Sequence, residues 1–323
     1  MPLEVLELEE SHIEDAAALF VENYRFFKRE LPLLPARYGD QDVIISMLAD
    51  LVRDNPSVAA FEDWRLVGYL SGFVLEDFQG LRTVYSPEWT GAALLGGSAR
   101  IYQDMYSRLA PDWIAGGCCQ HLVSLLNHDR DGIQGWVRMG FGMLAFDGLL
   151  QPGVLSGVNE RVEVRQAGKK DAGQLKVFFD GLQSHMAGAP TYWLHQFPPP
   201  QDWLSEQGRE MFLAYLDGQP AGCMGLNPGH PDGCDILKDS GTATIEIVYI
   251  RPEFRRSGVG QALLDFFQNY ARAQGFQRVA VEYESANVTA ARFWERWFDP
   301  VCCSLLRRID DRICPALGTK NRG

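Results

Sequence analysis

The residues best suited to chemistry lie at 251–261, where the chain reads Arg-Pro-Glu-Phe-Arg-Arg-Ser-Gly-Val-Gly-Gln. Gly258 and Gly260 let the backbone come close to a ligand that a side chain would obstruct. An apolar run at 243–250 indicates a strand before the glycines, and helical periodicity follows them. The first N–H groups of a helix lack internal partners and lie at the positive end of its dipole, so this turn predicts a phosphate-binding site.

Two common phosphate loops do not fit this turn. No Lys-Ser/Thr pair follows the second glycine, as the nucleoside triphosphate loop requires. The dinucleotide fingerprint needs three glycines, and only two are present. What remains is Arg-x-x-Gly-x-Gly at 255–260, followed by an amphipathic helix, a second strand at 278–283 and Asn287. This succession resembles the pyrophosphate loop of the GCN5-related N-acetyltransferase superfamily, which binds acetyl-coenzyme A.

The resemblance implies a set of cofactor-binding positions. Backbone N–H groups of residues 256–261 would hold the pyrophosphate, and the side chains of Arg255 and Arg256 would add charge-assisted contacts. Residues 248–250 would offer a strand edge to the pantetheine arm. Asn287 would hydrogen-bond the cofactor, and it is equally a preferred N-cap of the helix that follows. The full set implied is Val248, Tyr249, Ile250, Arg255, Arg256, Ser257, Gly258, Val259, Gly260, Gln261, Asn287 and Phe293.

Acetyl transfer to an amine requires the neutral amine, so a general base is useful. Glu246 stands inside the apolar strand, where partial desolvation would raise the pKa of its carboxyl. The alternative for Glu246 is an acid facing solvent on an exposed strand face. Glu282 and Glu284, on the neighbouring strand, are alternative bases.

The sequence pattern leaves several candidates for the proton donor to the leaving thiolate. The superfamily usually has a Tyr after the Asn in this role, but Trp294 occupies that place here, and an indole cannot deliver a proton at neutral pH. Tyr249 and Tyr283 could substitute as the donor, and the thiolate could also leave unaided or be protonated by water. No Cys stands in the cofactor loop, so we expect direct attack without an acyl-enzyme. The candidate catalytic residues are Glu246, Glu284 and Tyr283.

These residues fall in the second of two similar halves, with a period of about 160 residues. Each half has a Pro-Glu-aromatic element, at 87–89 and 252–254, and each has a hairpin signal, at 62–65 and 217–220. The sequence thus predicts an α/β (α+β) fold of two tandem acetyltransferase-like domains, each a mixed, mostly antiparallel sheet flanked by helices. The predicted domains are 1–152, a degenerate copy, and 160–323, which binds acetyl-CoA.

The first half lacks the features of a cofactor site. After 87–89 the chain reads Thr-Gly-Ala-Ala-Leu-Leu-Gly-Gly-Ser, so the Arg-x-x-Gly-x-Gly spacing is absent. Asp129 stands where the second half has Asn287, and a carboxylate is unsuited to lie beside a polyanion. We therefore expect the first half to keep the fold without the cofactor.

A segment at 184–200 is rich in aromatic residues and proline. In the superfamily this region covers the acceptor site, so it forms either a substrate lid or a surface that packs against the first domain. His185, His195 and His230 show no metal-ligand spacing and are expected to be structural or surface residues. We predict no metal site.

Composition narrows the class of protein. A net charge of −12 argues against binding nucleic acid or an anionic membrane and favours an amine-bearing substrate. No apolar run reaches the roughly 18–20 residues of a membrane span, and the N-terminus shows no signal-peptide pattern. The seven cysteines are odd in number and show no Cys-x-x-Cys spacing, so we expect reduced thiols in a cytoplasmic protein.

The function expected is an acetyl-CoA-dependent N-acetyltransferase acting on the amine of a small molecule or peptide. Two alternatives stay open: a non-catalytic acyl-CoA sensor, and an acyltransferase that uses a longer acyl group. The sequence does not name the acceptor or the oligomeric state.

Overall fold

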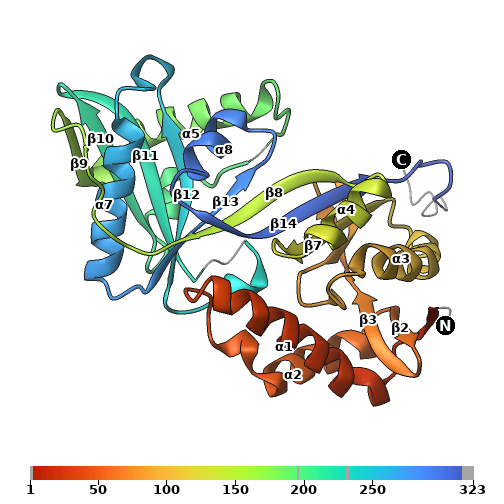
Figure 1. Ribbon diagram of the computed structural model, residues 1–323. Helices are drawn as coiled ribbons and strands as arrows, with labels where there is room; N and C mark the ends of the chain where they lie inside the picture. The colour runs from red at the N-terminus through yellow and green to blue at the C-terminus, as the bar shows by residue number, and fades with distance from the viewer. Residues whose placement is uncertain (1–2, 195, 230–232, 315–323) are drawn as a thin grey trace. The chain divides into compact units, whose positions relative to one another are not determined.

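The computed structural model describes residues 3–194, 196–229 and 233–314 (Figure 1). The chain divides into two compact units. The first consists of residues 1–146, 234–236 and 301–323, and the second of residues 147–233 and 237–300. His195 and His230, which the sequence analysis singled out, lie outside the described residues.

The first unit contains two groups of strands. Strands β1 (Glu4–Glu7), β2 (Ser57–Glu62), β3 (Arg65–Ser71) and β6 (Gly91–Ala93) form an antiparallel sheet in the order β1-β2-β3-β6. The second group contains β4 (Phe73–Phe78), β5 (Leu81–Ser86), β7 (Gln120–Leu126) and most of β14 (Asp299–Arg308), with β5 and β7 parallel. The helices are α1 (Ile13–Glu30), α2 (Gln41–Asp54), α3 (Ser98–Ala115) and α4 (Arg130–Arg138), and β8 (Gly142–Leu150) leads out of the unit.

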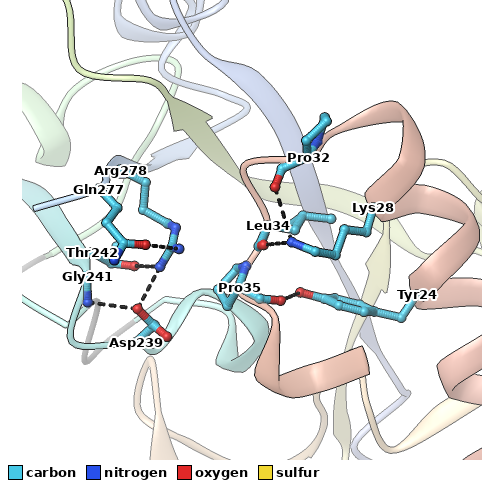
Figure 2. A network of polar contacts seen from close by, with 10 residues as sticks. All are labelled: Tyr24, Lys28, Pro32, Leu34, Pro35, Asp239, Gly241, Thr242, Gln277 and Arg278. Carbon is cyan, nitrogen blue, oxygen red and sulfur yellow. Dashed lines mark hydrogen bonds and ion pairs between the residues drawn. The ribbon is translucent and has the colours of Figure 1, made fainter. Parts of the chain in front are cut away.

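Helix α1 illustrates how the sequence builds the first unit. Its apolar residues recur at helical spacing, so that Phe20, Tyr24 and Phe27 are all buried on one face. Two hydrogen bonds hold the following loop against this helix: the Tyr24 hydroxyl donates to the Pro35 carbonyl at 2.7 Å, and the Lys28 ammonium donates to the Pro32 carbonyl at 3.1 Å (Figure 2).

The second unit contains a run of neighbouring strands from one sheet, with helices on both of its faces. Strands β9 (Val162–Gln166), β10 (Glu210–Leu216), β11 (Gln219–Pro228), β12 (Thr242–Ile250) and β13 (Arg278–Glu284) lie in the order β13-β12-β11-β10-β9, antiparallel except for β12 and β13. The helices are α5 (Ala172–Ala187), α6 (Pro200–Trp203), α7 (Val259–Ala273) and α8 (Val288–Trp294).

Strand β10 explains why this sheet needs a helix on each face. Phe212 packs on the aromatic residues of α7, whereas its neighbours Met211 and Leu213 join a core cluster with Phe178 and Phe179 of α5. Because both faces are buried, the strand reads as a continuous apolar run. Figure 1 shows α5 and α7 on opposite sides of β10 and β11. The predicted fold class, mixed and mostly antiparallel sheets flanked by helices, is confirmed.

A buried ion pair fixes the start of the parallel pair. The Arg278 guanidinium, whose side chain is 7% exposed, lies 2.6 Å from the Asp239 carboxylate, which also accepts the Gly241 N–H at 2.7 Å (Figure 2). Arg278 also donates to the Thr242 hydroxyl at 3.4 Å. These contacts hold the first residues of β12 and β13 together, from which the two strands then diverge.

The predicted domain boundaries and the compact units differ in three segments. Residues 147–152, predicted in the first domain, belong to the second unit. Residues 234–236, between β11 and β12, and the chain from Val301 onwards belong to the first unit, where β14 pairs with β7 from Cys302 opposite Leu126 to Arg308 opposite Gln120. The division at 1–152 and 160–323 stays a prediction.

The cysteines are a partial correction to the sequence analysis. Cys118, Cys223, Cys234, Cys302 and Cys303 are buried thiols outside any disulfide of the described residues. Cys119 and Cys314 form a disulfide, with their Cα atoms 6.1 Å apart, so the expectation that all thiols are reduced is wrong for this pair. The two are 195 residues apart, and sequence spacing gave no signal of the pair. In the part of the chain that the structure describes, no helix is long and apolar enough to cross a membrane.

Candidate functional site

A cleft of about 1130 Å³ opens in the second unit. Its lining comes from α5, β12, the turn before α7, β13 and α8. It brings together nearly all the positions that the sequence singled out, namely Glu246, Val248, Tyr249, Ile250, Arg255, Arg256, Gly258, Gly260, Gln261, Glu282, Tyr283, Glu284, Asn287 and Phe293.

The cleft exists because β12 leaves its partner. Strands β12 and β13 pair in parallel from Thr242 opposite Arg278 to Ile245 opposite Val281, and within the described residues their register ends there. The last five residues of β12 are all partly exposed, unlike the buried ones before them. Backbone groups beyond Ile245 therefore face the cleft rather than β13, and such an edge can pair with an extended ligand.

A β-bulge on the other side of β12 adds to this divergence. Cys223 of β11 lies opposite Tyr249, but Gly225 lies opposite Glu246, so β12 has one extra residue at this point. Ile247 adopts φ of +49°, which is a rare and costly conformation for a β-branched side chain. Bulges of this kind re-aim backbone and side-chain groups and recur beside active sites. Here the bulge turns the segment after Glu246 towards the cleft.

The turn before α7 leaves the helix N-terminus accessible. Gly258 is the N-cap with φ of +86°, a left-handed conformation that favours glycine. Because glycine has no side chain, no N-cap side chain covers the first N–H groups of the helix. A Cβ on Gly260 would lie 3.0 Å from the Ile250 side chain and 3.3 Å from Phe293. The two glycines thus keep both the backbone geometry and the space above the helix, which is the arrangement of an anion site.

Two predicted cofactor residues shape the turn without lining the cleft. Val259 is 1% exposed and packs in the core, where it fixes the first turn of α7. The Ser257 carbonyl accepts a hydrogen bond of 2.7 Å from the Asn159 side-chain amide, and the Ser257 hydroxyl donates to the Phe254 carbonyl. Both residues therefore hold the loop in position, and neither presents its side chain to the cleft.

Asn287 combines the two roles that the sequence left open for it. It is the N-cap of α8 and accepts the Ala290 N–H at 3.4 Å, while it also lines the cleft. Its side chain contacts α5 as well: the oxygen lies 3.3 Å from His185 Nε2, and the amide donates to the Met186 sulfur at 3.7 Å. His185 lines the cleft, a position that sequence reasoning missed because 102 residues separate it from Asn287.

Two carboxylates in the cleft lie in different surroundings. Glu246 is half-buried and accepts a hydrogen bond of 3.0 Å from the Asn227 amide, which fixes its orientation. Burial raises the pKa of the Glu284 carboxyl above its usual range, although its own backbone N–H opposes this. Burial, with smaller contributions from Glu295 and Asp147, raises the pKa of Tyr283 to about 12, so this phenol stays protonated near neutrality.

The Cys223 thiol is unsuited to covalent catalysis. Cys223 lies on β11 beneath the bulge and is fully buried, and burial raises the pKa of its thiol to about 12. A thiol of this kind is inert near neutral pH. Among the described residues, the lining of the cleft includes no cysteine.

Part of the cleft lining is aromatic. Phe197 and Trp203 line the cleft together with Arg209, whose guanidinium lies 4.5 Å from the centre of a Trp203 ring and pairs with Glu206 at 2.9 Å. The sequence analysis placed a substrate lid or an interface at 184–200. Gln196, Phe197 and Pro198 of this segment line the cleft, and whether they act as a lid stays a prediction.

In the first unit, carboxylates occupy the N-terminus of α3, which is the helix terminus that corresponds to that of α7. Asp131 accepts the N–H of Ala99, in the first turn of α3, at 3.1 Å. Asp129 accepts from the Ser98 hydroxyl at 2.6 Å and caps α4 through the Gly132 N–H at 2.9 Å. Gly135 packs so closely on the Ala99 backbone that a Cβ would lie 2.7 Å away. The helix terminus that would bind a phosphate is thus already occupied by the chain's own acids.

The N-cap residues of α4 and α8 nevertheless have the same backbone geometry. Asp129 has φ and ψ of −78° and 71°, and Asn287 has −79° and 69°. Each caps the N–H three residues later, at the start of a Trp-bearing helix that follows a strand. This similarity agrees with the internal repeat read from the sequence, and it identifies one side-chain difference, carboxylate against amide, at the equivalent place.

A comparison with known protein families finds a match in the second half of the chain. Residues 180–299 match the sequence model of the Acetyltransferase (GNAT) family, so this segment is a domain of that family. The predicted superfamily is therefore confirmed for this part of the chain. In a comparison with curated proteins, no sequence matches.

Solved structures show that the likeness of fold extends further along the chain. A GCN5-related N-acetyltransferase from Sphaerobacter thermophilus superposes with a TM-score of 0.52 at 13% identity, over 97% of this chain and 96% of that one. A GCN5-related glucosamine N-acetyltransferase region of a fungal multi-domain GH3 β-N-acetylglucosaminidase gives 0.50 at 13% identity, over 94% of this chain and 38% of that one. This chain thus matches well under half of the fungal protein. At such identities the likeness concerns the fold alone.

Proposed function

We propose that the cleft of the second unit binds acetyl-CoA and that the protein transfers the acetyl group to an amine of a small molecule or peptide. The observation that carries this proposal is the open N-terminus of α7, next to a strand edge that β13 has left. The N-terminus of α7 suits a pyrophosphate, and the strand edge suits the extended arm attached to that pyrophosphate. Arg255 and Arg256, which line the same end of the cleft, supply positive charge.

In this proposal Glu246 is the general base. An amine is mostly protonated at neutral pH, so its lone pair becomes available only after a proton is lost. Glu246 lies one residue before the bulge, and its carboxylate is oriented by Asn227. Glu246 takes the first proton, and the neutral amine nitrogen then forms a bond to the thioester carbon. The carbon–sulfur bond breaks, its electron pair goes to sulfur, and the nitrogen loses its second proton to water. Glu284, whose pKa is raised by burial, is the alternative base.

Tyr283 suits the role of a hydrogen-bond donor to the departing sulfur better than that of a full acid. Its pKa of about 12 lies some 3–4 units above that of an ordinary thiol, at about 8.5. Complete proton transfer would therefore be uphill by roughly 5 kcal/mol, at 1.36 kcal/mol per unit. A hydrogen bond from Tyr283 would stabilise the thiolate, and water would then protonate it.

A panel of amines tests the function. The full chain is mixed with acetyl-CoA and each amine, and release of the coenzyme A thiol is followed with a disulfide dye. We expect thiol release that depends on one class of amine, with the acetylated product seen by mass spectrometry. Tight acetyl-CoA binding without turnover on any amine would instead support the non-catalytic sensor, which is motivated by Trp294 in the place of the usual acid. Faster transfer of a longer acyl group would support the other alternative.

A further inference from the structure

Three buried side chains of types that can bind a metal ion meet in the first unit. Glu88 and Cys234 are each 2% exposed and Cys302 is fully buried. One carboxylate oxygen and the two sulfur atoms all lie within 4.8 Å of one another. The three residues come from the turn after β5, from the segment 234–236 and from β14, so no sequence spacing reveals them. The chain's cysteines were expected to hold no metal because Cys-x-x-Cys is absent, but a zinc site needs convergence in space rather than a local motif.

Two hydrogen bonds, made by the adjacent residues Glu88 and Trp89, hold the segment that contains Cys234. One Glu88 oxygen accepts the Ile236 N–H at 2.6 Å. The indole of Trp89 donates to the Asp235 carboxylate, also at 2.6 Å. Glu88 and Trp89 thus clamp the two residues that follow Cys234. Outer contacts of this kind orient ligands and hold a site to its geometry.

The third position is fixed by the sheet. Cys302 lies opposite Leu126 in the antiparallel register of β14 and β7. Alternation along β14 sends the next residue, Cys303, to the other face, where it joins the core cluster that contains Leu125 and Trp136. The two adjacent cysteines therefore have different surroundings, and only Cys302 belongs to the cluster with Glu88.

The donor set selects the metal. Two thiolates with one carboxylate suit Zn²⁺, which takes sulfur at about 2.3 Å and carboxylate oxygen at about 2.0–2.2 Å in a tetrahedron. Donors around such an ion lie some 3.5–3.8 Å apart, so donor atoms that all lie within 4.8 Å of one another need to approach by roughly 1 Å at most. Hard ions such as Mg²⁺ would need more oxygen ligands than the cluster supplies.

We propose that Glu88, Cys234 and Cys302 bind one Zn²⁺, with a water in the fourth position. The ion ties the segment 234–236 and β14 to the turn after β5. A fourth ligand that is water is otherwise typical of catalytic zinc, but all three protein ligands here are buried away from substrate, so we assign the ion a structural role. Binding deprotonates both thiols and releases their protons to solvent. This proposal is independent of acetyl transfer.

The test uses the full chain, purified with a phosphine reductant and without chelators. We expect elemental analysis to find about one zinc per chain, and X-ray absorption at the zinc edge to show two sulfur neighbours near 2.3 Å. Replacing the metal with Co²⁺ should give a sulfur-to-cobalt charge-transfer band. Cys302→Ser and Glu88→Gln should lose the metal or bind it at least tenfold more weakly.

Cys303→Ser is the matched control, since it alters the neighbouring buried thiol on the other face of β14. It should retain the zinc. The absorption measurement on the unmodified chain remains decisive even if a variant fails to fold. A chain that takes up neither Zn²⁺ nor Co²⁺, a bound ion without sulfur neighbours, or a Cys234–Cys302 disulfide found by peptide mapping would each overturn the proposal.

Discussion

Glu246 is the residue on which the proposed proton transfer depends. Glu246→Gln keeps the size of the side chain and its contact with Asn227 but removes the basic oxygen. We expect turnover to fall by roughly 10²–10⁴-fold, with the largest loss at low pH, where the amine is chiefly protonated. Cofactor affinity should change little. Steady-state rates from pH 6 to 9 provide the measurement.

Glu253→Gln is the control for this substitution, because Glu253 is exposed, pairs with Arg251 and is absent from the cleft lining. It should leave the rate unchanged. If the Glu246 variant were as active as the native chain throughout this range, the base would be Glu284, Glu282 or water.

Residue-scale features divide sharply into those that the sequence could predict and those that it could not. The turn at Asp217-Gly218 was readable, since Asp-Gly favours the positive φ values of 50° and 75° that both residues adopt. The positive φ at Ile247 was not, because local propensity opposes it and only the surrounding sheet enforces it. The closure of α3 by Asp131 was also beyond the sequence, as it depends on how α4 packs.

At the scale of elements, an ion pair joins β9 to the start of α5. Arg165 donates to both oxygens of Asp171, at 2.7 and 2.9 Å, and the Gly168 N–H donates to the same carboxylate at 2.8 Å. The Arg165 hydrogen bonds first, and then the Gly168 N–H, lower the pKa of Asp171 to about 2, although partial burial opposes them. Because the pKa is lower in the folded chain, this contribution to stability is complete above about pH 4 and is lost as the pH falls towards 2.

Asp171→Asn should therefore destabilise the chain at pH 7 by about 1 kcal/mol, a modest value because Arg165 is partly exposed and solvent screens the pair. Thermal unfolding of the native and variant chains at several pH values checks this. The difference in Tm should shrink as the pH falls from about 4. A difference that stayed constant down to pH 2 would mean that the ion pair is not its cause.

The order of elements around the cleft was predictable, but its opening was not. Strand, glycine turn, helix, strand and Asn-capped helix follow from patterns that are local in sequence. The divergence of β12 from β13 after Ile245, and the approach of α5 to Asn287 through His185, are tertiary features. They arise from the extra residue at the bulge and from packing between segments some 100 residues apart.

For the whole molecule, the path of the chain limits how it can be divided. Residues 302–308 pair with β7 in the first unit, and Val301, Cys302, Cys303 and Leu305 are all fully buried there. The repeat in the sequence gave no sign of this, since each half reads as complete in itself.

A fragment of residues 160–323 should therefore be less stable than the full chain, because it leaves β14 without β7 and exposes its apolar residues. We expect a lower Tm and a tendency to aggregate, measured by calorimetry and light scattering. A fragment as stable and as monodisperse as the full chain would show that β14 does not need this partner.

The central claim is that the second unit alone binds acetyl-CoA, because α7 has an open N-terminus while acids close that of α3. Titration calorimetry on the full chain tests it most directly. We predict one site per chain, abolished by Gly260→Asp, which adds a carboxylate in the first turn of α7, and retained in Gly97→Asp, the N-cap of α3. Two sites per chain, or unchanged binding in Gly260→Asp, would contradict the account.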